Sequence, residues 1–367
     1  MAKPLHRIYS DGPRVYNKTV MTAHMRKAPG RLFRIFPFLI LILAFTQPAF
    51  AEEPALRKAP VDKDGRYYNP WAEEGGRSFL DFLKWRLSRN PWSAEKKRPY
   101  DFAVTRPDFA SLNSTEGNWF VWLGHSTVLM RVNGKTIITD PVFWDVNFLV
   151  KRKTPFPIEP LLLPKIDFVL ISHGHYDHLN TKTIEFLKEK HDPFFITGPG
   201  YGAYFKSLGI TRHASLNWSE EYVTDSVSIT SLPVQHWSKR TLSDSNRMLW
   251  CSFLIEHSGK RYYWIGDSGY FSGFRDIGLK YGPIDIVFAP IGAYEPRWFM
   301  KENHMDPEET LKTARDLNAR TLVPIHWGTF DLSDEPLPQP IRKLKEAHSK
   351  NPHPDLTILP HGGSLRD

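Results

Sequence analysis

Cysteine is almost absent from this chain, because its 367 residues include only Cys251. A single cysteine excludes an intramolecular disulfide and also excludes a cysteine-rich metal site. Cys251 lies within the apolar, strand-like run 249–255. We therefore interpret it as a buried structural thiol rather than as a nucleophile.

The chain beyond residue 51 lacks an excess of charge of either sign. The whole sequence has 48 Lys and Arg against 40 Asp and Glu, a net charge of +8. Eight of the basic side chains and only one of the acidic side chains fall within residues 1–51, which leaves +1 for the remainder. A nearly neutral body does not provide a broad surface for phosphate backbones, so we predict no nucleic-acid partner.

A hydrophobic run long enough to span a bilayer comfortably is also missing. The apolar run 35–45 is short, follows the basic segment 31–34 and precedes Ala49-Phe50-Ala51. This order is typical of a secretory signal peptide, so residues 1–51 are predicted to be cleaved after Ala51. The expected location is the periplasm or envelope of a bacterium, and the alternative is a retained N-terminal membrane anchor.

Aromatic residues, in contrast, are plentiful at 14%, with 12 Trp. They suit an aromatic core, an aromatic-lined cleft or a protein that works near lipid. Residues 52–115 are rich in Pro, Arg and Trp and contain one predicted helix at 78–88. We interpret 52–115 as an extension that packs on a main domain formed by 116–367.

Strand and helix patterns alternate through that main domain. Apolar runs at 119–123 and 127–132 predict strands, and Asn133-Gly134 is a strong hairpin signal. A buried strand is predicted at 168–172, and a helix at 307–317 with Asp306 as its N-cap. The pattern indicates one α/β domain with mixed sheets.

Histidines and aspartates follow several of these strands. His173-x-His175-x-Asp177-His178 comes directly after the strand at 168–172. Four more candidates stand singly at or soon after strand ends: Asp140, His236, Asp267 and His326. Imidazole and carboxylate ligands suit zinc, and a site with an open position leaves room for water. Each segment alone is weak evidence, but the ordered set predicts a metal centre.

The order of these residues resembles that of the metallo-β-lactamase superfamily. The finer context is similar to one branch, N-acyl phosphatidylethanolamine phospholipase D and its bacterial relatives. The segments that carry the resemblance are 122–127, 139–141, 172–178, 235–241, 265–267, 291–300, 304–309 and 325–330. The resemblance implies an αββα sandwich of two mixed β-sheets flanked by helices, with the metals at one edge.

The resemblance also implies two zinc ions per chain, with iron or manganese as alternatives. One zinc would be held by His173, His175 and His236, and the other by Asp177, His178 and His326. Asp267 would bridge the pair, and Asp140 would orient a ligand histidine. His125, in the Gly-His-Ser-Thr turn, is either a second orienting residue or a structural turn residue.

Further site residues are expected around the metals. Asp177 or Asp267 could accept or relay a proton, and His304 could contact phosphate or donate a proton to the leaving group. The other candidates are expected to line the substrate cleft, with packing as the alternative: Tyr294, Arg297 and Trp298.

The predicted reaction is hydrolysis of a phosphodiester by a hydroxide that bridges the two metals, of phospholipase D type. The expected substrate is N-acyl phosphatidylethanolamine, a related phospholipid or a small phosphodiester, with peripheral membrane contact and a possible homodimer. The main alternative is a lactonase or ester hydrolase of the same fold. β-Lactam hydrolysis and a non-catalytic envelope protein with a zinc site remain as further alternatives.

Overall fold

The computed structural model describes residues 57–72, 78–114 and 116–367. The predicted signal peptide and its cleavage site lie outside these residues. Within them, no helix combines the length and the apolar character that crossing a membrane requires.

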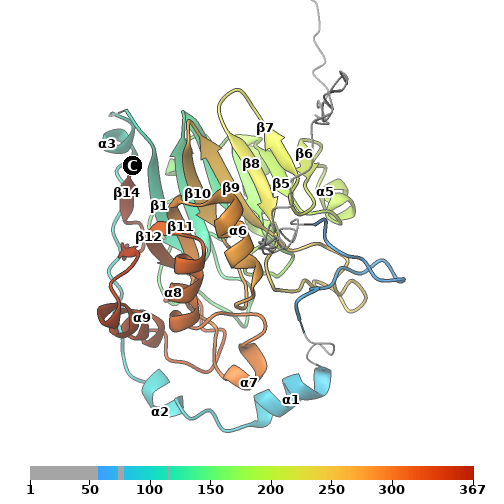
Figure 1. The fold of residues 1–367 in the computed structure, drawn as a ribbon, viewed down its shortest axis with the longest axis vertical. Coiled ribbons are helices and arrows are strands. Elements are labelled where there is room, and N and C mark those ends of the chain that lie inside the picture. Colours follow the sequence, from blue (N-terminus) through green and yellow to red (C-terminus); the bar gives the residue numbers. More distant parts are fainter. Residues whose placement is uncertain (1–56, 73–77, 115) are drawn as a thin grey trace, which may run out of the picture. The chain divides into compact units, whose positions relative to one another are not determined.

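Two seven-stranded mixed sheets form the main domain (Figure 1). The first sheet has the order β14 (Ser364–Arg366), β1 (Trp119–Gly124), β2 (Thr127–Val132), β3 (Lys135–Thr139), β4 (Phe168–Ile171), β5 (Phe194–Thr197) and β6 (His213–Ser215). The second has the order β13 (Asp355–Leu356), β12 (Ala319–Ile325), β11 (Ile284–Pro290), β10 (Lys260–Trp264), β9 (Ser252–His257), β8 (Ser228–Leu232) and β7 (Glu221–Val223). The predicted α/β sandwich of two mixed sheets is confirmed.

Each sheet combines a parallel part with an antiparallel part. Strands β3 to β6 run parallel, as do β10 to β13. The remaining pairs are antiparallel, including the β2–β3 hairpin, in which Val132 pairs with Lys135. Asn133 and Gly134 turn this hairpin with φ values of 46° and 76°, as the Asn-Gly signal predicts.

Helices cover the outer faces of the two sheets. Helices α4 (Thr181–His191) and α5 (Gly202–Ser207) pack on the first sheet, where Ile184 and Phe205 join a cluster with Val169. Helix α8 (Pro307–Asp316) contacts β11 and β12, and α6 (Gly273–Tyr281) and α9 (Gln339–Lys350) contact α8. Asp306 caps α8 by accepting from the backbone N–H of Glu308 and Glu309, which confirms the predicted start of this helix.

The main core fills the space between the sheets. Its members include Trp122 from the first sheet and Trp264 and Phe288 from the second, all fully buried. The rings of Phe120 and Phe288 lie 5.5 Å apart across this interface. Because the two sheets share this core, the strand ends that carry the predicted ligands are held in a fixed relation to each other.

The extension before the main domain packs on it through aromatic side chains. Its helices are α1 (Phe79–Leu87), α2 (Ser93–Lys96) and α3 (Phe109–Asn113). Trp85 of α1 stacks on Phe299, and Phe102 meets Trp327 edge to face. The helix predicted at 78–88 is confirmed, with Ser78 and Ser88 as its caps, while the boundary at residue 115 stays a prediction.

One strand is shorter than the sequence indicates. The apolar run 248–256 predicts a strand throughout, but β9 begins only at Ser252. Before it, the N–H of Leu249 donates to Pro199 O and that of Cys251 donates to Ser172 O. This segment is therefore bonded to the first sheet, and Cys251 is a buried thiol whose pKa is raised by burial to about 12.

Candidate metal centre

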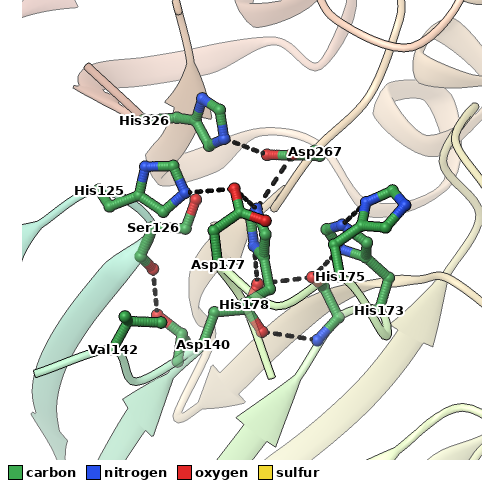
Figure 2. A network of polar contacts seen from close by, with 12 residues as sticks. His125, Ser126, Asp140, Val142, His173, His175, Asp177, His178, Asp267 and His326 are labelled. Atoms are coloured by element: carbon green, nitrogen blue, oxygen red, sulfur yellow. Dashed lines mark hydrogen bonds and ion pairs between the residues drawn. The ribbon is translucent and has the colours of Figure 1, made fainter. Parts of the chain in front are cut away.

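The predicted ligands converge where strands of both sheets end (Figure 2). Asp140 follows β3 and the 173–178 run follows β4 in the first sheet, while Asp267 and His326 follow β10 and β12 in the second. Parallel strands present their carboxyl ends at the same edge, and the shared core brings the two edges together. Distances of less than 4.8 Å link candidate ligand atoms within each of several His and Asp groups.

The first of these groups, here called the imidazole cluster, consists of His173, His175 and His236. His175 Nδ1 lies 2.8 Å from His173 Nε2 and 3.3 Å from His236 Nε2. His173 Nδ1 donates to Ser172 Oγ, and His236 Nδ1 donates to Asn303 O, so both rings turn Nε2 toward the cluster. Oriented rings of this kind are typical of metal-ligating histidines.

The second group, here called the mixed cluster, contains the predicted ligands Asp177, His178 and His326 together with His125. Asp177 Oδ2 lies 3.4 Å from His178 Nε2 and accepts from His125 Nε2 at 3.0 Å. The His125 ring also lies 4.1 Å from that of His326, whose backbone N–H donates to His125 O. His125 therefore touches two ligands of the mixed cluster, as an orienting residue would.

Asp267 lies between the two clusters. Its Oδ2 is 3.1 Å from His178 Nε2 and 3.9 Å from His236 Nε2, and its Oδ1 is 3.1 Å from His326 Nε2. Burial would raise the pKa of this carboxyl, but His178 and His326 hold it well below its usual value. An ionised carboxylate that faces both clusters fits the predicted bridging position.

Asp140 forms hydrogen bonds that hold ligand rings of both clusters, directly to His178 and through Ser172 to His173. Its Oδ2 accepts from His178 Nδ1 and from Ser172 Oγ, both at 2.6 Å, and its Oδ1 accepts from Ser172 N at 2.8 Å. Because these bonds occupy both oxygens, Asp140 acts on the ligand rings rather than as a ligand. The bond to His178 leaves Nε2 of that ring facing the mixed cluster.

Three residues of the site have a left-handed backbone conformation. Asp140, His125 and His326 all have positive φ values, at 31°, 51° and 61°. Non-glycine residues rarely adopt this conformation, and it costs about 1–3 kcal/mol where surrounding structure enforces it. Packing and hydrogen bonds at this edge therefore hold three site residues in conformations that a free chain would avoid.

Several buried ring and carboxylate atoms at the site have no hydrogen-bond partner among the described residues. They are His175 Nε2, His178 Nε2, Asp267 Oδ1, His304 Nδ1 and both ring nitrogens of His326. An unpaired buried polar atom is costly, so a group of them around one point calls for a ligand. The donor set of imidazoles and carboxylates fits divalent transition metals, and the structure therefore has clusters able to bind metal.

His304 lies beside both clusters. Its Nδ1 is 3.8 Å from Asp267 Oδ2, and its ring is 5.2 Å from that of His236. Burial lowers the pKa of His304 to about 4, against the opposing charge of Asp267. A neutral imidazole at this position can offer one N–H to a substrate oxygen.

The three predicted cleft residues differ in their placement. Tyr294 is fully buried and donates its hydroxyl to Gln339 Oε1, so its prediction as a cleft residue is wrong. Arg297 donates to His304 O at 2.9 Å and to Glu309 Oε2, which makes it a support for the His304 loop. Trp298 is 39% exposed and remains at the surface.

Arg240 was not predicted as a site residue, although it lies in the 235–241 segment. Its Nη1 donates to Gly174 O and to Leu179 O, both at 2.8 Å, and its guanidinium lies 4.4 Å from the Tyr176 ring. Ser238 Oγ accepts from the N–H of Gly174. Both side chains thus fix the backbone between the ligands, a role for which residue type alone carries no signal.

A sandwich of two mixed sheets with His and Asp clusters at one edge defines a metal-dependent hydrolase fold. Residues 135–327 match the Beta-lactamase superfamily domain. The chain is 38% identical over 260 residues to an N-acyl-phosphatidylethanolamine-hydrolyzing phospholipase D of Caenorhabditis elegans, covering 66% of this chain and 72% of that protein. The chain is a metal-dependent hydrolase that belongs to the metallo-β-lactamase superfamily and, within it, to the branch of these phospholipase D proteins.

Other relatives are consistent with this membership. The chain is 38% identical over 237 residues to the mitochondrial N-acyl-phosphatidylethanolamine-hydrolyzing phospholipase D of Saccharomyces cerevisiae, covering 61% of this chain and 50% of that protein. Among solved structures, a metallo hydrolase of Ignicoccus hospitalis superposes with a TM-score of 0.54 at 22% identity, covering 69% of this chain and 99% of the other. An isothiocyanate hydrolase from Delia radicum gut bacteria gives 0.54 at 20% identity, covering 67% of this chain and 98% of the other. These structures share the fold with this chain.

Proposed function

We propose that this hydrolase is a dinuclear zinc phosphodiesterase that cleaves N-acyl phosphatidylethanolamine, or a related phospholipid, in a phospholipase D-type reaction. The observation that carries the proposal is the position of Asp267 between an imidazole cluster and a mixed cluster. The names of the C. elegans and yeast relatives support the lipid substrate.

The imidazole cluster would hold one ion, the mixed cluster would hold the other, and Asp267 would reach both. A bound pair of divalent ions supplies a nucleophile from water at neutral pH and neutralises charge on a phosphoryl group. Ser172 orients His173 for this role. Asp140 orients His178, and the backbone carbonyl of Asn303 orients His236. Zinc suits imidazole and carboxylate ligands, and metal analysis of the purified protein distinguishes it from iron or manganese.

The protein's own groups would then manage the protons. Asp177 and Asp267 are ionised, since nearby histidines, against the effect of burial, hold the pKa of both carboxyls well below its usual value. Either carboxylate can accept a proton during attack. His304 is neutral and its Nδ1 has no hydrogen-bond partner among the described residues, so it can contact a phosphoryl oxygen; to protonate the leaving alcohol it would first have to take up the proton that Asp177 or Asp267 accepts.

The decisive experiment is incubation of the zinc-loaded protein with N-acyl phosphatidylethanolamine. We expect release of phosphatidic acid and an N-acylethanolamine, and loss of both products in His236→Ala. Parallel assays use bis(p-nitrophenyl) phosphate and an acyl lactone. Lactone hydrolysis without cleavage of either phosphodiester would refute the proposal and favour the lactonase alternative.

Export and membrane contact belong to the same proposal. A signal peptide at 1–51 would place the enzyme in the periplasm or envelope, where phospholipid is its neighbour. Sequencing the N-terminus of the mature protein tests this, because cleavage after Ala51 leaves Glu52 as the first residue. Sedimentation equilibrium tests the possible homodimer.

A further inference from the structure

Exposed apolar side chains gather on two turns of the connection between β3 and β4. The first turn, 146–150, carries Phe148 and Leu149, which are 83% and 77% exposed. The second is the 3-10 helix η1 (Pro160–Leu162), in which Leu161 and Leu162 are 72% and 51% exposed. Exposed groups of large apolar residues on a folded protein mark interaction surfaces.

The two turns border one groove. Phe148 and Asn147 line it from the first turn, and Glu159 and Pro160 line it from the second. Its other walls combine aromatic side chains, which are Phe143, Trp144 and Phe156, with charged ones. We call the two turns and this groove the docking face.

Hydrogen bonds hold the first turn in its outward shape. The N–H of Val146 donates to Val150 O, and Asn147 Oδ1 accepts from the N–H of Leu149 and of Val150 at 2.8 and 2.9 Å. The N–H of Arg152 donates to Asp145 Oδ1. A turn closed by its own polar groups presents Phe148 and Leu149 to the outside instead of folding them inward.

The charges around these apolar tips are mainly positive. Lys151 lines the groove, is exposed and has no ion-pair partner among the described residues. Lys182 lies 4.3 Å from the Trp144 ring at the groove wall. The acidic side chains in the groove are Asp145, which is bonded to the Arg152 backbone, and Glu159. Exposed apolar tips with adjacent lysines are complementary to an anionic bilayer surface.

The docking face is close to the metal centre. Phe143 in the groove wall is three residues beyond Asp140. Arg152 donates to Val142 O and lies 5.3 Å from the Phe330 ring, and that ring lies 5.0 Å from His125. The side chains of Arg152 and Phe330 thus lie between the groove and His125 of the mixed cluster.

We propose that this docking face binds the surface of an anionic phospholipid bilayer. Phe148, Leu149, Leu161 and Leu162 enter the headgroup region, and Lys151 and Lys182 contact acidic headgroups. The surface would bring lipid close to the mixed cluster, from which the side chains of Arg152 and Phe330 separate the groove. That last step rests on the proposed function, whereas the docking itself does not.

The test measures co-sedimentation with vesicles for two proteins. One is the unchanged full chain, and the other is a double variant that carries both Phe148→Asn and Leu149→Asn. The vesicles are phosphatidylcholine with about one third phosphatidylglycerol, and pure phosphatidylcholine for comparison. We expect the double variant to bind the anionic vesicles about 100-fold more weakly, since each of the two inserted apolar side chains contributes roughly a factor of ten. Val223→Ser with Leu279→Asn, which also removes two exposed apolar side chains, is the matched control and should bind as the unchanged chain does.

A second variant tests the charges. Lys151→Gln with Lys182→Gln should bind anionic vesicles several-fold more weakly and with a smaller dependence on salt, but should bind pure phosphatidylcholine unchanged. All variants should hydrolyse soluble bis(p-nitrophenyl) phosphate at the original rate. This separates docking from chemistry, because vesicle binding is measured without turnover.

Two results would overturn the inference. If the Phe148→Asn with Leu149→Asn variant and the lysine double variant both bind vesicles as the unchanged chain does, these turns do not contact lipid. Conversion of a dimer into monomers by Phe148→Asn with Leu149→Asn, with vesicle binding retained, would assign the face to a second copy of the chain. A different result separates the two proposals. If the variants lose vesicle binding but the unchanged chain does not cleave phospholipid, the proposed function is refuted and the docking face stands.

Discussion

The imidazole cluster of His173, His175 and His236 contains no carboxylate, whereas the mixed cluster combines His178 and His326 with Asp177. Burial lowers the pKa of His173 and of His236 well below the usual value. Burial acts on His178 in the same direction, but Asp267, Asp177 and Asp140 together raise its pKa well above the usual value. Burial therefore sets the direction of the pKa shift at His173 and His236, whereas nearby carboxylates set it at His178.

Because of this difference, the order of the two clusters should depend to different degrees on bound metal. The mixed cluster has internal charge compensation, because the His178 ring is paired with carboxylates. The rings of the imidazole cluster contact one another and two neutral acceptors, Ser172 Oγ and Asn303 O, while Asp267 Oδ2 lies 3.9 Å from His236 Nε2. We therefore expect the mixed cluster to keep its order without metal, and the imidazole cluster to depend on metal.

Asp267→Asn should have the largest effect, because it removes the one carboxylate that faces both clusters. The substitution keeps the size and removes the charge. We expect activity on bis(p-nitrophenyl) phosphate to fall by more than the roughly 100-fold typical of residues that only orient ligands. Metal content, measured on the same samples, should fall in both clusters. Asp285→Asn, which removes a buried carboxylate bonded to Arg261 N, is the control, and an equal loss there would contradict the bridging role.

Asp140→Asn should mainly weaken the mixed cluster. It removes the charge that holds the His178 ring, and about a 10- to 100-fold loss of metal affinity is expected there. Ser172→Ala is the matched variant for the other half, since Ser172 orients His173. Competition with a graded series of chelators measures both sites. The comparison between the clusters fails if the two variants weaken the same site.

Arg240→Ala should cause a smaller loss, of about tenfold in metal affinity, chiefly in the imidazole cluster. The reason is that Arg240 and Ser238 fix Gly174, between His173 and His175. Arg240→Lys should recover little, because a lysine lacks the planar group that lies over the Tyr176 ring and whose second nitrogen donates to Thr181 Oγ1. If the Tm of the metal-free protein falls while metal affinity is kept, Arg240 supports the fold and not the site.

The mildest effect should be a pH dependence of the metal-free protein. Burial lowers the pKa of His175 and of His304 to about 4, from an unfolded value near 6.5. A depressed histidine pKa gives stability that is complete above pH 6.5 and is lost as pH falls toward 4, since the unfolded chain takes up protons first. The Tm should therefore fall by several degrees between these values. A flat Tm over this range in the metal-free protein would show that these rings are not buried as neutral groups.

Much of the main domain is predictable from local patterns. The 127–132 strand, the Asn133-Gly134 turn and the Asp306 cap are confirmed because each depends on neighbouring residues along the chain. The short edge strands β13 and β14 and helix α9 were not predicted. Edge strands of two or three residues form only because a partner strand is already in place.

For the site, the run from His173 to His178 and the acidic or histidine ends of later strands were visible in the sequence. The roles of Tyr294 and Arg240 were not, because both depend on contacts across the fold. Tyr294 bonds to Gln339 and Arg240 bonds to Gly174, residues 45 and 66 positions away. Residue type shows which side chains can ligate a metal, but not which side chains hold the backbone that carries them.

The sequence by itself determined the ligand types, their order and the strands that carry them, because these follow from hydrophobic periodicity and side-chain chemistry. The tertiary structure alone decided that an imidazole cluster and a mixed cluster meet at Asp267. It also decided in which direction the pKa of His178 and of His236 shifts, since these shifts follow from burial and from carboxylates brought near by packing of the two sheets.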